Sequence, residues 1–307
     1  MGGSVDDELT PRRQQGRSLA APGFFAKVRL TLDMIKFEHS VFALPFALTG
    51  ALLARRGLPT WRELFWIVVA MVGARSAAMT FNRLADLKLD ALNPRTQARP
   101  LPTGRLSLGF AAGFTALSGG LLVLAAYELN PLAFKLSPLA ILILLGYSFT
   151  KRFTVLSHLV LGLCLGMSPP AAWIALRGDL SLSVLLLGAA VTLWVAGFDI
   201  IYACQDVEFD HALDLHSIPR RYGIRAGLYA SAVFHIVMLV LLVVVARMEQ
   251  LGWIAAGGLV LVAALLAYEH VLVKPSDLSR VNAAFFIVNG WISVLFFLTW
   301  AADILVH

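Results

Sequence analysis

The sequence contains few charged residues and almost no cysteine. Only 14% of its 307 residues are Asp, Glu, Lys or Arg, against about 25% in ordinary soluble domains. This composition leaves too little polar surface for a soluble fold of this length, and it excludes an intrinsically disordered chain. The two cysteines, Cys164 and Cys204, each stand in an apolar run with no CxxC motif. A disulfide framework and a structural zinc site are therefore excluded as well.

Long apolar runs take the place of the missing charge. Hydrophobic residues make up 59% of the chain, and its mean hydropathy is +0.77. A helix of about 20 apolar residues crosses the hydrocarbon core of a bilayer and satisfies its own backbone hydrogen bonds there. Nine runs are long enough: 36–54, 64–85, 107–126, 132–149, 155–176, 181–204, 226–246, 252–273 and 282–305. We therefore predict an all-α, polytopic membrane protein with nine transmembrane helices.

The N-terminal segment and the loops set the predicted topology. Residues 1–30 lack the apolar stretch of a signal peptide, so we predict a flexible tail that includes an interfacial segment near residues 24–32. Residues 31–307 then form the transmembrane domain. With the N-terminus in the cytoplasm, 18 of the 25 Lys and Arg residues lie on the cytoplasmic side, in agreement with the positive-inside rule. No basic stripe covers a soluble face, so nucleic-acid binding is not expected.

Two short stretches, 81–104 and 198–223, collect seven of the 19 acidic residues next to the membrane on the predicted cytoplasmic side. The first carries, four residues apart and so on one helix face, Asn82, Asp86 and Asp90. The second carries, at the same interval and after an earlier Asp199, the residues Asp206, Asp210 and Asp214. Carboxylates at the edge of a bilayer are costly enough to indicate a functional site.

Such rows of carboxylates repel one another unless a cation separates them. Only Lys88 is close in sequence to the first row, and no Lys or Arg lies between Asp199 and Arg220. Carboxylate and amide oxygens are the ligands that Mg²⁺ prefers, with phosphate oxygens and water completing its shell. We therefore predict that the two rows face each other across Mg²⁺.

Basic residues follow both acidic stretches and complete a site for a polyanion. Guanidinium groups suit phosphate oxygens, and lysine supplies a point charge. The predicted phosphate contacts are Arg95, Arg99, Lys151 and Arg152, with a weaker case for Arg220, Arg221 and Arg225. Two acidic rows with Mg²⁺, basic residues and an apolar bundle fit a diphosphate that carries a long hydrocarbon tail.

In these residues the chain resembles the UbiA superfamily of membrane aromatic prenyltransferases, over residues 30–305. The matching motifs, in chain order, are Asn82-x3-Asp86-x3-Asp90, Arg95-Thr96-x2-Arg99-Pro100-Leu101-Pro102, Tyr147-x3-Lys151-Arg152-x-Thr154 and Tyr202-Ala203-x2-Asp206-x3-Asp210. The resemblance implies nine helices around a central cavity, with cytoplasmic cap helices and both Asp motifs at the cavity mouth. It also implies Mg²⁺-dependent transfer of a polyprenyl group from polyprenyl diphosphate to an acceptor, often an aromatic ring.

The resemblance also implies roles for individual residues. The Mg²⁺–diphosphate complex would be bound by Asn82, Asp86, Asp90, Asp206 and Asp210. Contacts to the diphosphate or the acceptor would come from Tyr147, Lys151 and Arg152, with Arg99 supporting the pocket. The family's usual Asp after the motif Asn is Arg83 here. Arg83 therefore either contacts the diphosphate or pairs with Asp86, and the number of metal ions stays open.

The segments around Glu38, Asn82 and Asp199 resemble a bacterial branch described as 4-hydroxybenzoate polyprenyltransferase-like, which implies quinone biosynthesis in the inner membrane. The acceptor stays open between a hydroxybenzoate, a dihydroxynaphthoate of the futalosine route to menaquinone and, more distantly, the vinyl group of haem. Glu38 and His39 either contact this acceptor or mark the membrane interface. The ring proton goes to Asp199, to a diphosphate oxygen or to water.

A function of another class also fits duplicated acidic segments: a cation-coupled transporter. Transporter sites lie near the bilayer midplane at broken helices, whereas these carboxylates lie at helix ends beside a run of arginines. This placement favours the enzyme. A non-catalytic scaffold leaves the repeated Asp spacing without a role. The length of the prenyl chain and the oligomeric state are not indicated by the sequence.

Overall fold

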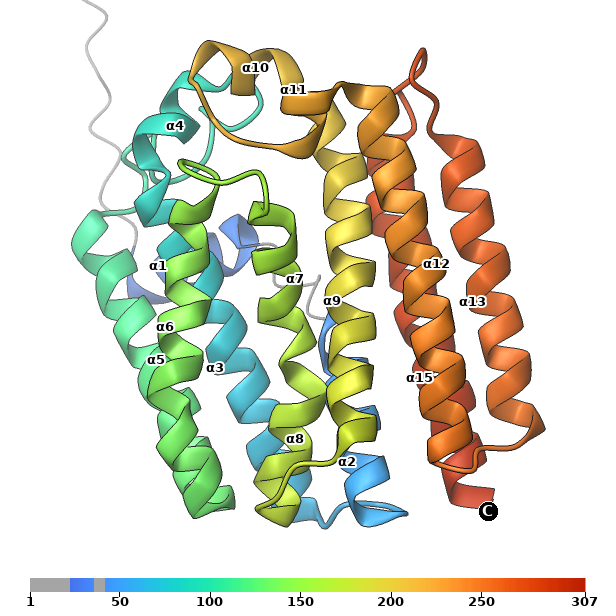
Figure 1. Cartoon of the computed structure of the whole chain (residues 1–307). Helices are drawn as coiled ribbons and strands as arrows, with labels where there is room; N and C mark the ends of the chain where they lie inside the picture. The colour runs from blue at the N-terminus through green and yellow to red at the C-terminus, as the bar shows by residue number, and fades with distance from the viewer. Residues whose placement is uncertain (1–22, 36–41, 307) are drawn as a thin grey trace, which may run out of the picture.

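The chain folds into a bundle of long, roughly parallel helices (Figure 1). The computed structural model describes residues 23–35 and 42–306. The long helices are α2 (Leu44–Arg55), α3 (Trp61–Ala85), α5 (Leu108–Leu129), α6 (Pro131–Thr150), α7 (Ser157–Gly166), α8 (Ser168–Arg177), α9 (Leu182–Ala203), α12 (Ile224–Met248), α13 (Trp253–Leu272) and α15 (Asn289–Val306). The last is preceded by α14 (Val281–Ala283) and a π-helix, η3 (Ala284–Val288).

The predicted all-α membrane architecture is confirmed. In the described residues, eight helices or joined helix pairs are long and apolar enough to cross a membrane. Their ends fall within three residues of the predicted spans, except that the one that begins at Leu182 continues to Ala212, eight residues past the predicted end. The first predicted span differs, because α2 has 12 residues and covers only about 18 Å. The start of that predicted span, 36–41, lies outside the described residues.

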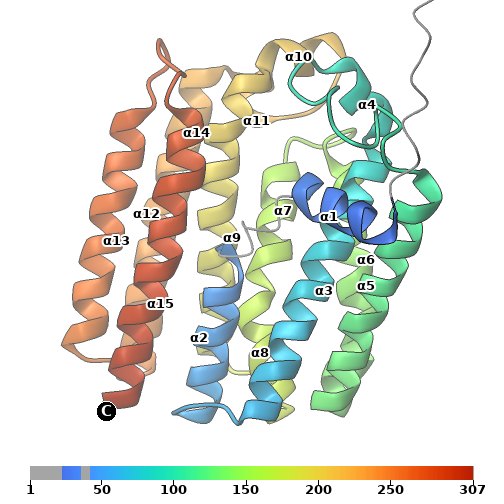
Figure 2. The same ribbon diagram turned by 180° about the vertical axis from the view of Figure 1, so that it is seen from behind.

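Short helices close one end of the bundle, which we call the capped end. They are α4 (Leu87–Leu92), the 3-10 helix η2 (Cys204–Asp206), α10 (Val207–Ala212) and α11 (Ile218–Tyr222). Helix α1 (Phe24–Met34) lies across the bundle just below this end (Figure 2). Its residues Met34 and Ile35 pack on Leu101 and Leu106. The division at residue 30 stays a prediction.

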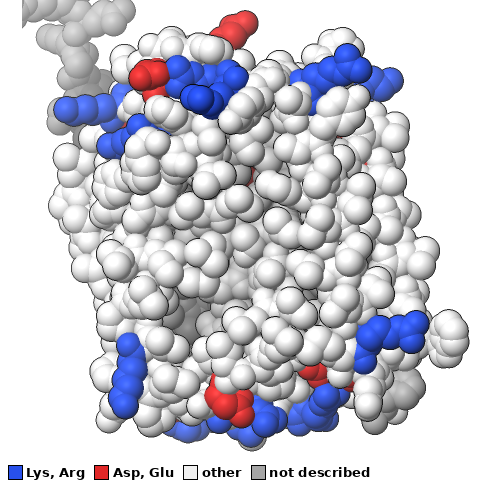
Figure 3. Space-filling model, viewed as in Figure 1, with Lys and Arg blue, Asp and Glu red and all other residues white. Residues whose placement is uncertain are grey.

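Charged side chains lie at the two ends of the bundle (Figure 3). The face shown there carries basic and acidic groups in an upper and a lower band, with a broad and almost uncharged zone between them. This is the pattern that a bilayer imposes, since charged side chains are excluded from its hydrocarbon interior. The protein is a multi-pass membrane protein.

Helix α9 forms the centre of the bundle and approaches α7 very closely. Its residues Trp194, Val195 and Ile200 are at most 1% exposed. A Cβ atom at Gly162 of α7 would collide with the backbone carbonyl oxygen of Thr192 in α9. Small residues allow such contact between helix backbones in membranes. This contact fixes the position of α7 relative to α9.

Replacing Gly162 by alanine should therefore destabilise the protein. The added methyl group forces α7 and α9 apart, and overpacking of this kind costs about 1–3 kcal/mol. The apparent Tm of purified protein in detergent should fall. The matched control is Gly113→Ala on α5, where a Cβ atom meets nothing within 4 Å. Equal melting temperatures for the two variants would contradict the close packing.

Candidate active site

A polar cavity of about 370 Å³ opens inside the capped end. Its walls come from α3, α6, α7, α9 and η3, and its rim from α4, α10 and the loops beside them. Most of the sequence-predicted site residues in the described part of the chain line it, and Arg152 contacts it through Asp86. The candidates that do not line it are Asp214, Arg220, Arg221 and Arg225. Glu38 and His39 lie outside the described residues. The two acidic segments therefore meet at one cavity.

The first carboxylate, Asp86, stands where α3 ends and α4 begins. Its side chain is almost fully buried, with 3% exposed. It accepts from Lys151 Nζ at 2.8 Å and from Arg152 Nη2 at 3.2 Å. The amide of Asn82 donates to the same carboxylate at 3.2 Å. Two cations from the end of α6 thus neutralise one buried acid group.

Asp90 lies one turn further on, in α4, and is also paired. Arg99 Nη1 lies 2.8 Å from each carboxylate oxygen, and Arg83 Nη1 lies 3.5 Å from Oδ2. Arg83 therefore bonds Asp90 rather than Asp86. Burial lowers the pKa of the Arg99 guanidinium, as does the neighbouring Arg83, while Asp90 acts in the opposite direction. The pair holds the loop after α4 against the cavity rim.

The second acidic segment approaches from the opposite wall. Arg95 donates from Nη2 to Asp206 Oδ2 at 2.7 Å and from Nη1 to the hydroxyl of Tyr202 at 2.6 Å. The hydroxyl of Ser217 donates to Asp210 Oδ2 at 2.8 Å. Arg95 belongs to the first acidic segment, so this ion pair ties the two predicted motifs together across the cavity.

One detail of the predicted acidic rows is wrong. The third acid of the second row, Asp214, leaves the helix with φ at +54° and pairs with Arg220 away from the cavity. The carboxylates in the cavity have basic partners that come from the loop after α4 and from the end of α6, so the pairing depends on tertiary structure.

Below the ion pairs the cavity continues between α3, α6, α7 and α9. Asp199, Tyr147 and Arg75 line this deeper part. One wall is aromatic: the ring centroids of Tyr202 and Phe285 lie 4.4 Å apart, and those of Phe198 and Phe285 lie 5.1 Å apart. The cavity thus changes from charged at its mouth to aromatic inside.

Sequence reasoning missed two residues of this cavity. Arg75 was placed in an apolar span and given no role, although a cation inside a span is itself a signal of function. His158 carried no such signal, because a single histidine in an apolar stretch is ordinary. In the structure it bonds Asp199 at 2.7 Å.

The donor chemistry of the cavity fits Mg²⁺ together with a phosphate ligand. Among the described residues, no three acidic, histidine or cysteine side chains come close enough to hold an ion unaided. Mg²⁺ is usually held by one or two carboxylates, with substrate phosphates and water as its other ligands. The residues that would hold it are the carboxylates Asp86, Asp90, Asp206 and Asp210 and the amide of Asn82.

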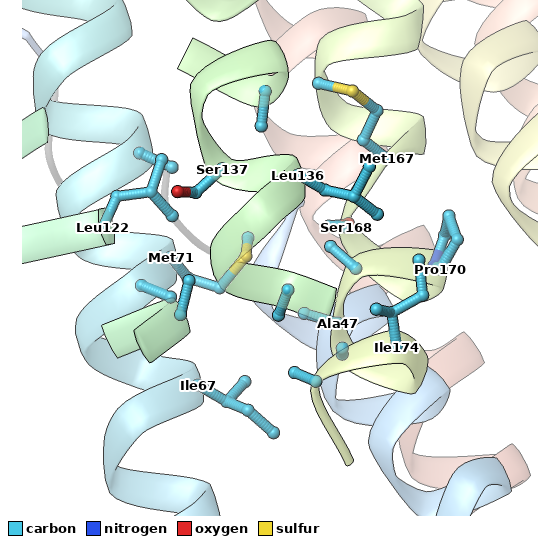
Figure 4. Close-up of a pocket in the computed structure, with 18 of the residues that line it drawn as sticks. Ala47, Ile67, Met71, Leu122, Leu136, Ser137, Met167, Ser168, Pro170 and Ile174 are labelled. Carbon is cyan, nitrogen blue, oxygen red and sulfur yellow. The ribbon is translucent and has the colours of Figure 1, made fainter. Parts of the chain in front are cut away.

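A second hollow, of about 310 Å³, lies further along the bundle (Figure 4). Its lining is apolar and includes Ile67, Met71, Leu136 and Met167. On α3, α6 and α7 the residues that line it neighbour those that line the polar cavity, as Ala74 neighbours Arg75. The two hollows therefore lie end to end, the apolar one towards the uncapped end.

The fold and the cavity define a membrane-embedded enzyme with a charged mouth and an apolar interior. Residues 43–300 match the model of the UbiA prenyltransferase family. The chain is 31% identical to a 4-hydroxybenzoate octaprenyltransferase of Shewanella denitrificans, over 92% of this chain and 97% of the relative. The chain belongs to the UbiA prenyltransferase family and is a prenyltransferase.

Solved structures agree with this assignment. The apo structure of a UbiA homolog from Aeropyrum pernix K1 superposes with a TM-score of 0.79 and is 37% identical, covering 87% of this chain and 98% of the homolog. A UbiA homolog from Archaeoglobus fulgidus, solved with DMAPP and Mg²⁺, has a TM-score of 0.70 and 19% identity, covering 89% of this chain and 98% of that one. The second likeness concerns the fold alone.

Replacing Asp90 by asparagine should destabilise the capped end. It leaves Arg99 and Arg83 without their counter-charge in a largely buried position, and breaking such a pair costs about 2 kcal/mol or more. The apparent Tm in detergent should fall, and the double variant Asp90→Asn/Arg99→Gln should recover part of the loss. Asp214→Asn, which removes an exposed pair, should leave the Tm unchanged. A similar shift for both single variants would contradict the assignment.

Proposed function

We propose that the protein transfers a polyprenyl group from polyprenyl diphosphate to the ring of a hydroxylated aromatic acid, with Mg²⁺ as cofactor. The observation that carries the proposal is the meeting of two acidic segments and their basic partners at the mouth of a cavity with an aromatic wall inside. A relative that is 31% identical is named a 4-hydroxybenzoate octaprenyltransferase, and this supports the same chemistry. A dihydroxynaphthoate acceptor is the alternative within this class.

The ion pairs explain how a diphosphate would enter. Lys151, Arg152 and Arg95 each hold a carboxylate at 2.7–3.2 Å. Phosphate oxygens accept from the same donors, and guanidinium groups bind them in bidentate fashion. On diphosphate binding, these cations would exchange a carboxylate for phosphate, and the freed carboxylates would be available to hold Mg²⁺. Bound Mg²⁺ would supply charge stabilisation for the diphosphate leaving group.

The hydrocarbon tail would lie in the apolar hollow. That hollow continues the polar cavity along α3, α6 and α7, so a molecule with a charged head and an apolar chain fits the two in sequence. Walls of aliphatic side chains keep water from the allylic carbon as its bond to oxygen breaks. The charged residues at the mouth hold the head, and the position of the hollow sets the direction of the tail.

The acceptor would lie deeper than the diphosphate, beside the aromatic wall. Phe198, Tyr202 and Phe285 line the cavity there, and offset or edge-on ring contacts suit an aromatic acceptor. Arg75 lies on the opposite helix, α3, within the same cavity. A guanidinium group inside a membrane span pairs well with the carboxylate of an aromatic acid. Tyr147, on α6, borders the same space.

The distribution of basic residues supports the orientation and location. We propose a bacterial inner-membrane enzyme with a cytoplasmic N-terminus and a cavity that opens to the cytoplasm, because the capped end carries most of the Lys and Arg residues.

Product analysis by mass spectrometry tests the function: purified protein receives one polyprenyl diphosphate with hydroxybenzoate or dihydroxynaphthoate. A prenylated acid is expected, and cation flux without product would favour the transporter.

Replacing Asp86 or Asp206 by alanine should reduce prenyl transfer more than 100-fold, since each removes an oxygen ligand and releases a cation at the site. Initial rates with purified, correctly inserted protein measure this. Chelation of Mg²⁺ in the wild type should abolish transfer, and added Mg²⁺ should restore it. The control Asp214→Ala removes an acid outside the cavity and should retain activity. Near-native turnover of either cavity variant would exclude the diphosphate site.

Replacing Ala74 by phenylalanine should shorten the donors that the enzyme accepts. Ala74 lines the apolar hollow and directly precedes Arg75, which lines the polar cavity, so a ring there obstructs the tail but not the head. The kcat/KM ratio of a long to a short prenyl diphosphate should fall about tenfold or more, the equivalent of roughly 1.4 kcal/mol. Ala112→Phe, on the exposed side of α5, should leave that ratio unchanged. A preserved ratio in Ala74→Phe would place the tail elsewhere.

A further inference from the structure

One carboxylate of the cavity is held differently from those that pair with basic side chains. Asp199, on α9, accepts a hydrogen bond at 2.7 Å from His158, at the start of α7. In the described part of the chain, no lysine or arginine lies within salt-bridge distance of Asp199. His158 is 3% exposed, whereas the side chain of Asp199 keeps 23% of its surface open towards the cavity. The histidine is thus buried behind an accessible acid.

The second nitrogen of His158 fixes its protonation state. The backbone N–H of Ile218 donates to Nε2 at 3.3 Å. A backbone N–H can only donate, so Nε2 carries no proton and the neutral ring carries its proton on Nδ1. Nδ1–H then donates to Asp199 Oδ2, which orients the carboxylate and leaves Oδ1 for another partner.

The same bond connects Asp199 to the acidic loop at the cavity mouth. Ile218 begins α11, and the preceding Ser217 donates to Asp210 at 2.8 Å. His216, in the same loop, donates its backbone N–H to the carbonyl oxygen of Lys151 at 2.6 Å. His158 therefore joins Asp199, on the cavity floor, to the start of α11, and the loop before α11 in turn contacts Asp210 of α10 and Lys151 at the end of α6.

The position of Asp199 suits the acceptor rather than the diphosphate. It precedes Asp206 by seven residues, or about 10 Å along a helix, towards the bundle interior. On α9 it directly follows Phe198 and precedes Tyr202 by three residues, and both of these rings belong to the aromatic wall. A group there would lie beside an aromatic acid stacked on that wall, while the ion pairs occupy the mouth.

We infer that Asp199 is the base that accepts the ring proton of the acceptor and that His158 is its positioning residue. This rests on the proposed function. In the step, the allylic carbon bonds to a ring carbon as the C–O bond breaks and its electrons leave with diphosphate. Asp199 Oδ1 then takes the proton from that ring carbon, and the C–H electron pair restores the aromatic ring. The neutral acid returns its proton to water at the cavity mouth.

Three variants separate this role from a structural one. Asp199→Asn removes the base and keeps the shape. His158→Leu removes both hydrogen bonds of the ring, whereas His158→Asn retains a short-chain N–H donor near the position of Nδ1. Asp179→Asn, in the loop between α8 and α9 at the uncapped end, is the matched control. Each purified full-length variant is compared with wild type by melting temperature, by the KM for polyprenyl diphosphate, and by kcat with ordinary and ring-deuterated 4-hydroxybenzoate.

Asp199→Asn should lower kcat about 100-fold or more, the usual contribution of a general base, with the KM for the diphosphate unchanged. Slow proton removal should then produce a primary isotope effect on kcat that the wild type lacks. His158→Leu should show a smaller loss with the same isotope effect, and His158→Asn should recover much of the rate.

Retained kcat in Asp199→Asn, or a loss without an isotope effect, would overturn the inference. Equal losses in His158→Leu and His158→Asn at normal melting temperature would overturn the positioning role. A wild type that forms no prenylated acid refutes the proposed function instead, so the two failures are distinguishable.

Discussion

The balance of buried charge at the capped end is the constraint on which the rest of the structure depends. Carboxylates at the edge of a membrane are unfavourable unless cations neutralise them. Here Asp86 forms ion pairs with Lys151 and Arg152, and Asp206 forms one with Arg95. The partners come from helix ends and loops far apart in the sequence, so neutralisation requires α3, α6 and α9 to meet at one place. The charges that make the site chemically useful also fix the mouth of the bundle.

The same pairs leave the site ready for an anion. A carboxylate that holds a cation at about 2.7–3.2 Å competes for it with phosphate oxygens, which bind the same donors at least as well. In the proposed function, binding of a diphosphate with Mg²⁺ would therefore exchange one set of charge-assisted bonds for another. Such an exchange would allow a cavity whose charges are paired without ligand to accept a polyanion.

Much of this could be predicted from the sequence, and the failures share one cause. Hydropathy located the spans because lipid demands about 20 apolar residues locally. The spacing of Asp86 and Asp90 identified the acidic site because both lie within two turns. The partners of these acids could not be predicted, since Lys151 meets Asp86 only after α3 and α6 pack. Asp214 was misplaced because its positive φ ends the helix, and spacing does not show where a helix ends.

The residues that line the cavity change in chemical type with their depth in the bundle. Along α9 and its extension, Asp206 lies at the charged mouth, Tyr202 one turn below it and Asp199 nearly one turn deeper. Along α3, Asp86 lies at the mouth, Arg75 three turns below and Ala74 at the start of the apolar hollow. In the proposed reaction, a head group held at the mouth and a tail held in the hollow would place the reactive carbon between these levels. Asp199 and the aromatic wall lie at that level, so the new bond would form where the charged lining gives way to the apolar one.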